Sequence, residues 1–320
     1  MNQYPLKFKP VYKEKIWGGR NLERLFSRAL PPGKKIGESW ELADLKEDAG
    51  IVANGPEAGK TLTELMRQWG GGLLGGAVAM PDGRFPLLLK LLDANDILSL
   101  QVHPDAEQVA AIGAGAAPKT ECWYILESRG GFIYKGVQPG VGRKQFAEAI
   151  EADDAEAIKR LVQRIDVAAG DFHYLPAGTV HALGAGVVVA EVQTPSDTTY
   201  RVTDWGRGRE IHVERSMQCI HFTPADDTAP GAMGETLLVT EFFTVTRRSL
   251  EAGQATGEPK GRCAAMMFLA GDAKVSHGGA VEPVVRVRAG DTVLLPAGLD
   301  APTILACGDC TWLEITLAES

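Results

Sequence analysis

Cysteine is scarce in this sequence, and so are long apolar stretches and blocks of basic residues. The five cysteines form an odd, scattered set, which is typical of a protein from a reducing compartment rather than one held together by disulfides. No uncharged stretch is long enough to span a bilayer, and the amino-terminal residues lack the apolar core of a signal peptide. We therefore expect a cytoplasmic protein that does not bind membranes.

Positive charge is also in the minority. The chain has 33 Lys and Arg against 41 Asp and Glu, a formal net charge of −8, and no run of basic residues interrupts this balance. General binding to nucleic acid has no electrostatic basis in such a chain. Any anionic ligand must instead be met by a local cluster of cations.

Turn-forming residues are abundant, which argues against an all-helical bundle. The chain has 37 glycines and 18 prolines in 320 residues, and its 45% hydrophobic content is sufficient for a packed core. Short runs rich in Val, Leu and aromatic residues, separated by Gly, Pro, Asp or Asn, are typical of antiparallel sandwiches and barrels. These runs are 38–43, 87–94, 97–103, 121–126, 131–136, 173–178 and 187–193. They predict a mainly β fold.

Two segments have helical patterns instead. In the region 57–70, Thr61-x-x-Glu64 is a plausible capping box, and the apolar residues that follow it lie on one helical face. In the region 143–166, an apolar stripe from Phe146 to Ile165 also fits a helix, with a break near Asp153. We interpret both as helical insertions in a β fold.

A ten-residue phrase occurs twice. AGDFHYLPAG at 169–178 recurs as AGDTVLLPAG at 289–298, so each copy predicts the same hairpin in one of two similar β-domains. A segment rich in Pro, Asp and Gly at 222–235 indicates the seam between them. We expect a first domain at 1–222, with both helical insertions, and a second at 235–320.

One pair of cysteines has the spacing of a metal or redox motif. Cys307-Gly-Asp-Cys310 has no second pair and no histidine nearby, and Gly308-Asp309 is typical of a hairpin turn between two apolar runs. We interpret this segment as a turn.

Four other residues could bind a metal. Gln101 and His103 are two apart at the end of a predicted strand, so both point to one face. Glu121 opens another strand, and His181 follows the first Pro-Ala-Gly corner. Two imidazoles, a carboxylate and an amide oxygen can surround one divalent ion, with a position left for water or substrate. The second copy of the phrase has Ala301 at the position of His181, so we expect one ion per chain.

The surrounding motifs resemble known families. Gly170-x5-Pro176-x-Gly178-x2-His181 is similar to the second metal-binding motif of the cupin superfamily, which implies two cupin-type jelly-roll barrels. More closely, six motifs in order resemble type I mannose-6-phosphate isomerase in its short bacterial form: GESWELA (37–43), FPLLLKLLDA (85–94), LSLQVHPD (98–105), KTECWYIL (119–126), PAGTVHALG (176–184) and SDTTYRVTDW (196–205). The resemblance extends from Lys15 to about residue 215 and continues weakly to the end.

This resemblance implies a zinc enzyme that interconverts mannose 6-phosphate and fructose 6-phosphate through an enediol-type proton transfer. It implies that the zinc ligands are Gln101, His103, Glu121 and His181, the same four residues nominated above. Further implied roles are catalysis for Arg201, Lys119 and Glu191, and substrate binding for Ser99, Lys90, Lys119 and Arg201. The expected partner is a small sugar phosphate, and the expected state is a monomer or small homo-oligomer.

Other interpretations remain open. Within the same fold the chain could be a cupin oxygenase or another sugar-phosphate isomerase, although iron oxygenases of the superfamily commonly use more imidazoles. A non-catalytic sugar-phosphate-binding or regulatory protein could keep the fold, but all the implied ligands and cations are present here. Without the resemblance, Arg201 would be interpreted as an ion-pair partner of Asp197 or Asp204.

Overall fold

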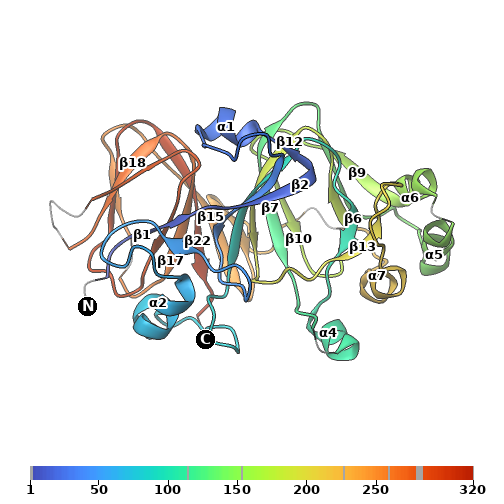
Figure 1. Cartoon of the computed structure of the whole chain (residues 1–320), viewed down its shortest axis with the longest axis horizontal. Coiled ribbons are helices and arrows are strands. Elements are labelled where there is room, and N and C mark those ends of the chain that lie inside the picture. The colour runs from blue at the N-terminus through green and yellow to red at the C-terminus, as the bar shows by residue number, and fades with distance from the viewer. Residues whose placement is uncertain are drawn as a thin grey trace.

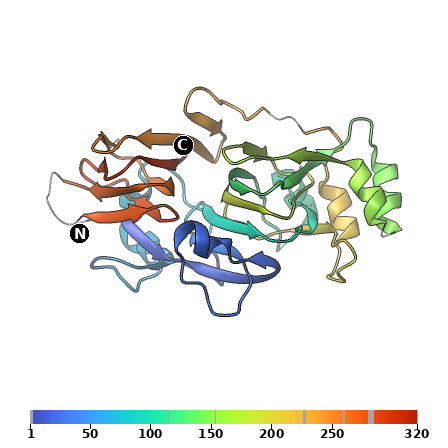
Figure 2. The same ribbon diagram turned by 90° about the horizontal axis from the view of Figure 1, so that it is seen from above.

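The computed structural model describes residues 3–113, 115–152, 154–225, 228–258, 260–278 and 284–319. Its strands form two barrels that lie side by side along the longest axis of the molecule (Figure 1). Figure 2 shows the same two halves from above, with the carboxy-terminal barrel in orange and red. The predicted mainly β fold with two jelly-roll barrels is confirmed.

Eight strands of the first barrel form two facing sheets. Their orders are β10-β7-β12-β5 and β6-β11-β8-β9, the arrangement of a jelly roll. The strands are β5 (Leu88–Ala94), β6 (Leu100–Val102), β7 (Glu121–Ser128), β8 (Phe132–Val137), β9 (Val162–Asp166), β10 (Phe172–Leu175), β11 (His181–Leu183) and β12 (Val187–Gln193). The first sheet is extended by β2 (Val11–Gly19) and β3 (Ile36–Leu42), and the second by β13 (Tyr200–Thr203).

The second barrel repeats this plan. Its sheet orders are β20-β17-β22-β15 and β16-β21-β18-β19, with β14 (Thr236–Val239) added beside β15. The strands are β15 (Phe243–Leu250), β16 (Ala255–Gly257), β17 (Ala264–Ala270), β18 (Asp272–Ser276), β19 (Val285–Arg288), β20 (Thr292–Leu295), β21 (Thr303–Ala306) and β22 (Cys310–Leu317). Residues 307–309 form the turn between β21 and β22, as the sequence predicts.

The repeated phrase forms β10 in one barrel and β20 in the other, at the same place in each sheet. Both strands follow a glycine in the left-handed region, Gly170 with φ 98° and Gly290 with φ 86°. The surroundings differ, because β10 is an edge strand whereas β20 is covered by β1 (Leu6–Lys9), with Leu6 opposite Leu294. The domain limits 1–222 and 235–320 remain a proposal, and this amino-terminal strand belongs to the sheet of the second barrel.

The region 57–70 contains the helix that its sequence pattern predicts. Helix α2 (Leu62–Trp69) begins with the expected capping box, in which the Thr61 side chain accepts from the Glu64 amide and Glu64 caps in return. A short helix, α3 (Gly71–Leu74), follows it. Amides of the second Pro-Ala-Gly corner donate to this helix, Ala297 to the carbonyl of Leu73 at 3.0 Å, and so α3 covers the second barrel.

The second helical prediction is only partly right. Two helices lie in this region, α5 (Arg143–Glu151) and α6 (Ala155–Leu161), and Asp154 caps α6, whereas Asp153 lies outside the described residues. Residues 162–166, predicted as helix, are instead strand β9. Val162 and Ile165 are spaced three apart as on a helix, but the open edge of β8 pairs them with Val137 and Ile133, and these contacts decide the conformation.

The remaining helices are short. They are α1 (Asn21–Phe26), α4 (Ala106–Ile112) and α7 (Val213–Cys219), and strand β4 (Ile51–Val52) completes the set beside β1. None of the described helices combines the length and apolar character that crossing a membrane requires.

Candidate active site

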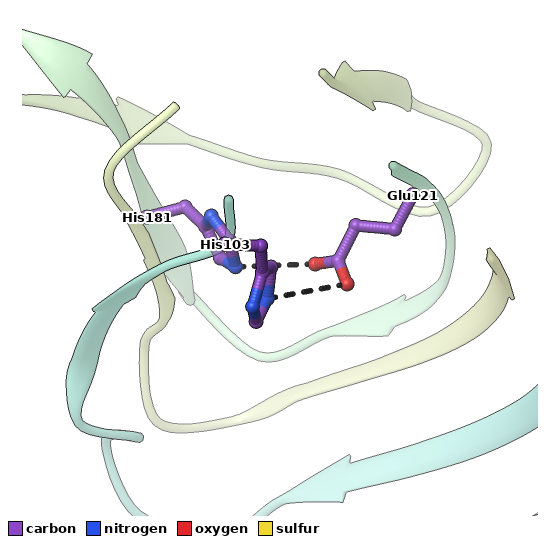
Figure 3. A group of neighbouring side chains, drawn as sticks. All are labelled: His103, Glu121 and His181. Atoms are coloured by element: carbon purple, nitrogen blue, oxygen red, sulfur yellow. Dashed lines mark ion pairs between the residues drawn. The ribbon is translucent and has the colours of Figure 1, made fainter. Parts of the chain in front are cut away.

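Three buried side chains converge inside the first barrel. His103 directly follows β6, Glu121 opens β7 and His181 opens β11, and Figure 3 shows both imidazoles facing the carboxylate. One potential ligand atom from each lies within 4.8 Å of the others. Antiparallel pairing of β11 with β6 brings the two histidines together, because it sets His181 opposite Gln101, which is two residues before His103.

Backbone carbonyls orient the two imidazoles. Nδ1 of His103 lies 2.8 Å from the carbonyl oxygen of Thr198, and Nδ1 of His181 lies 2.8 Å from that of Thr179. With Nδ1–H donating to these carbonyls, each Nε2 is left as the metal-binding atom. The Nε2 atoms lie 3.6 Å (His103) and 3.1 Å (His181) from the carboxylate oxygens of Glu121.

The protonation of these groups suits a cation. Burial, reinforced by the charge of Lys119, holds the pKa of His103 well below its ordinary value, so the imidazole is neutral. Burial would raise the pKa of Glu121, but Lys119 and the two imidazoles outweigh it and hold that pKa well below the ordinary value. Both carboxylate oxygens of Glu121 are buried, with the Lys119 ammonium and the two imidazoles as their polar neighbours. Such oxygens fit a metal ion.

Two further side chains adjoin this cluster. The amide nitrogen of Gln101 lies 3.3 Å from Nε2 of His181. A half-turn of this amide group exchanges its nitrogen and oxygen, so the side-chain oxygen can face the same point. Nζ of Lys119 lies 2.7 Å from Glu121 Oε2 and 3.2 Å from His103 Nε2. The structure therefore brings all four nominated ligands and Lys119 together.

A cavity of about 470 Å³ opens beside the cluster. Its walls are mostly polar and charged, and they include Gln101 and Lys119. Four other residues predicted from the resemblance also line it: Ser99, Lys90, Glu191 and Arg201. A cavity of this size accommodates a small ligand rather than a macromolecule.

Glu191 and Lys90 form a buried ion pair in the cavity wall. They are opposite each other on β12 and β5, and Lys90 Nζ lies 3.0 Å from Glu191 Oε1. Lys90 also donates to Gln193, and the Trp123 indole donates to Glu191 Oε2 at 2.9 Å. Burial alone would lower the pKa of Lys90, but Glu191 and Glu38 raise it, so the ammonium stays charged.

Arg201 has no carboxylate partner of the kind first considered. Asp204 pairs with Arg207 and Arg209 instead, and the Arg201 guanidinium donates to the backbone carbonyl of Glu210. Nε of Arg201 is buried without a hydrogen bond, and burial together with the charge of Arg209 lowers its pKa. Since Arg201 also lines the cavity, its free donor is available to a ligand.

Several cavity residues were not assigned a role from the sequence. Trp17, Glu38 and Trp40 lie within or beside quoted motifs, yet only the sheet shows that they face the cavity. Burial would raise the pKa of Glu38, but Lys90, Lys15 and hydrogen bonds outweigh it and lower that pKa to about 2. Alternation along β3 could have placed Glu38 and Trp40 on one face. No sequence signal marked Arg209.

Comparisons with known proteins agree with this geometry. Residues 6–125 match a family model described as the catalytic domain of phosphomannose isomerase type I. The chain is 34% identical to mannose-6-phosphate isomerase ManA of Bacillus subtilis over 97% of this chain and 98% of that protein. It is also 34% identical to the mannose-6-phosphate isomerase of Streptococcus mutans, covering 91% and 92%.

Solved structures extend the likeness to three dimensions. The crystal structure of mannose 6-phosphate isomerase from Bacillus subtilis superposes with a TM-score of 0.86, at 30% identity, covering 98% of this chain and 99% of that one. The Salmonella typhimurium mannose 6-phosphate isomerase has a TM-score of 0.76 at 19% identity, covering 98% and 99%, and this likeness concerns the fold alone.

Proposed function

Because the chain belongs to the type I phosphomannose isomerase family, we propose that it interconverts mannose 6-phosphate and fructose 6-phosphate in the cavity of the first barrel. The reaction moves a proton between C1 and C2 through an enediol-type intermediate. The observation that carries the proposal is the His103, Glu121 and His181 cluster beside a cavity lined with cations. Turnover that is lost with a chelator, as tested below, would distinguish an enzyme from a protein that only binds the sugar phosphate.

The residues that would hold the metal are His103, Glu121, His181 and the side-chain oxygen of Gln101. Nitrogen and carboxylate donors of this kind are typical of zinc, and we propose one zinc ion per chain. Two neutral imidazoles, one neutral amide and one carboxylate would leave a net charge of +1, so the bound ion would polarise a carbonyl and favour negative charge on the sugar oxygens.

Glu191 is our proposed base for the proton transfer. It lines the cavity, and its two oxygens accept from Lys90 and Trp123, which hold the carboxylate in one orientation. Each oxygen keeps a further lone pair that can accept a proton from carbon. Lys90 acts here through Glu191, because its ammonium already contacts Glu191 and Gln193.

Lys119 and Arg201 are the proposed electrostatic partners of the substrate. Arg201 has a buried Nε without a hydrogen bond, and its guanidinium lines the cavity one strand away from Gln101. Lys119 stands beside the proposed ligands. Both would stabilise the negative charge that develops on the sugar oxygens, and Ser99 would donate a hydroxyl to the substrate.

The decisive test is turnover of mannose 6-phosphate by the purified chain, before and after a chelator, with zinc measured on the same samples. We expect activity that falls with zinc content and returns when zinc is restored. Binding of the sugar phosphate without turnover would instead support the alternative of a non-catalytic binding or regulatory protein. Activity that needs dioxygen would indicate the oxygenase.

We also propose that the chain acts in the cytoplasm, as a monomer or small homo-oligomer with two domains at 1–222 and 235–320. Strand β1 in the second sheet and the contacts of α3 with the second Pro-Ala-Gly corner tie these units together. Limited proteolysis in the 222–235 segment would test whether the two units separate.

A further inference from the structure

The lysines of the cavity are already neutralised by nearby carboxylates. Each lies within 3.0 Å of a different carboxylate oxygen, and the pairs are Lys13 with Asp48, Lys15 with Glu38, Lys90 with Glu191 and Lys119 with Glu121. A contact ion pair attracts a distant anion less strongly than an unpaired cation does. The walls formed by β2, β3 and β5 are therefore close to neutral.

The arginines are different, because two of them share one buried carboxylate and a third, Arg201, contacts a backbone carbonyl instead. Asp204 accepts from Arg207 Nη2 at 2.9 Å and from Arg209 Nε at 2.9 Å, and Arg201 contacts only a backbone carbonyl. Asp96, which is exposed, also pairs with Arg207 at 3.8 Å, so three guanidinium groups have two carboxylates in contact and positive charge is in excess. Two other acids nearby, Asp197 and Glu210, are exposed to solvent, and Asp197 also lines the cavity.

Two of these arginines face the cavity. Arg201 and Arg209 line it, whereas Arg207 does not, and Arg207 instead donates to the backbone of Ile97. Arg209 uses Nε and Nη2 on Asp204, and the structure gives its Nη1 no hydrogen bond to any described residue. A planar guanidinium held at one edge presents its remaining donors in a fixed direction, which suits a phosphate group.

Arg201 and Arg209, which we call the arginine wall, line the same cavity that opens beside the metal-type cluster. Strand β13 pairs with β6, so Arg201, Gln101 and His181 lie in one row across neighbouring strands. Arg209 follows in the loop after β13 and lines the same cavity. A linear sugar phosphate with C1 and C2 at the cluster of His103, Glu121 and His181 carries its phosphate at the opposite end of the carbon chain. The arginine wall is the part of the cavity with uncompensated charge to receive it.

We propose that Arg209 binds the phosphate group of the substrate, and that Asp204 is a positioning residue which holds the Arg209 guanidinium toward the cavity. The inference rests on the proposed isomerase function and names the residue that makes it selective for phosphorylated sugars. The negative charge of the phosphate group complements the positive charge of the arginine wall, whereas an unphosphorylated sugar has no charge to interact with it.

The test compares Arg209→Met with the matched control Arg207→Met, which removes an arginine from the same carboxylate without touching the cavity. Three quantities are measured: kcat and KM for mannose 6-phosphate, kcat/KM for unphosphorylated mannose, and the inhibition constant of inorganic phosphate. For Arg209→Met we expect KM and the inhibition constant to rise roughly 10- to 100-fold, with kcat and the turnover of mannose little changed. For Arg207→Met we expect all three close to wild type.

Several results would overturn the assignment. An unchanged KM and inhibition constant in Arg209→Met would do so, as would equal losses in the two variants, which indicate a general effect of the charge on Asp204. A larger rise for Lys15→Met would place the phosphate on the lysine side. If Arg209→Met does not fold, Arg209→Lys keeps the charge but loses the fork, and it must still raise KM.

The outcome is separable from that of the proposed function. Wild-type protein that does not turn over mannose 6-phosphate, yet raises its thermal midpoint with inorganic phosphate in an Arg209-dependent way, keeps the anion site and refutes the isomerase. Wild-type protein with full turnover and an Arg209→Met variant of normal KM keeps the isomerase and refutes the anion site.

Discussion

The two barrels share one strand order and differ in what their interiors hold. Register identifies the matching positions: Glu121 lies opposite Leu175 and Gln193 in the first barrel, and Ala264 lies opposite Leu295 and Thr316 in the second. The carboxylate of the metal-type cluster is thus replaced by a methyl group. Within the described residues, the one group of three potential ligands is that of the first barrel.

Cavity size follows the same division. The first barrel opens to about 470 Å³, whereas the matching region of the second, between Glu258 and Glu314, holds about 10 Å³, room for no more than one water. Helix α3 covers the Pro-Ala-Gly corner of the second barrel, and the same corner of the first leads to His181. The jelly-roll fold therefore provides equivalent strand positions in both barrels. The side chains at those positions, and the segments that cover the barrel, decide whether a ligand site is present.

The largest expected effect comes from removing a proposed ligand. His181→Ala should abolish turnover of mannose 6-phosphate and lower zinc to well below one ion per chain, because it removes one of the two imidazoles and leaves Gln101, His103 and Glu121 as the remaining proposed ligands. His277→Ala in the second barrel is the control and should keep both. Zinc per chain by atomic absorption and turnover are measured together. Tight zinc binding by a chain lacking both His103 and His181 would break the contrast between the barrels.

The next effect separates catalysis from structure. Arg201→Met should lower turnover by roughly 10²-fold while leaving zinc content and the thermal midpoint near wild type, since it removes one donor to developing charge. Arg248 of the second barrel pairs with Glu235 and Glu314, so Arg248→Met should leave turnover unchanged. An Arg201 variant that simply unfolds, or one with normal turnover, would remove this residue from the catalytic assignment.

Smaller effects are expected in the pH dependence of stability, and they have opposite signs in the two barrels. The pKa of Glu38 is lowered to about 2, so its contribution is present above its ordinary pKa and is lost as the pH falls toward 2. Burial and repulsion by Glu314 raise the pKa of Glu258 to about 8, so its contribution is present at low pH and is lost as the pH rises toward 8.

Urea unfolding of Glu38→Gln and Glu258→Gln across the pH range checks both signs. Glu38→Gln should be less stable than wild type above pH ~4.5, with the difference shrinking on acidification. Glu258→Gln should equal wild type in acid and become the more stable protein toward pH 8. Parallel pH profiles for wild type and both variants would refute the assigned carboxyl environments.

The smallest effect concerns the helix that accompanies the second barrel. Thr61→Ala removes the side-chain half of the capping box of α2 and should lower the free energy of unfolding by about 1 kcal/mol. Thr61→Ser keeps the acceptor and should be close to wild type. Because α2 lies away from the cavity of the first barrel, kcat and KM should not change in either variant; a loss of turnover would show that this covering helix supports the site.

Sequence patterns predicted the fold and the cluster well where the signal is local. The run 187–193 was predicted as a strand and forms β12 over the same residues, and alternation on β6 together with the Pro-Ala-Gly corner indicated that Gln101 and His181 would meet. The prediction was wrong for residues 162–166, because a helical spacing of two apolar residues cannot show that β8 offers an open edge. Glu38 and Trp40 were within a recognised motif without a role, since their neighbours come from distant strands.

By itself, then, the amino-acid sequence determined the strand pattern, the internal repeat, the absence of a second histidine cluster and the family. These depend on residue type and on spacing along one strand or one turn. Only the tertiary structure decided which cavity cations are neutralised, that β1 covers β20, and that Arg207 and Arg209 share one buried carboxylate while Arg201 contacts a backbone carbonyl. Those features arise from contacts between side chains and strands whose proximity the chain acquires only on folding, and charge compensation depends on such distances rather than on composition.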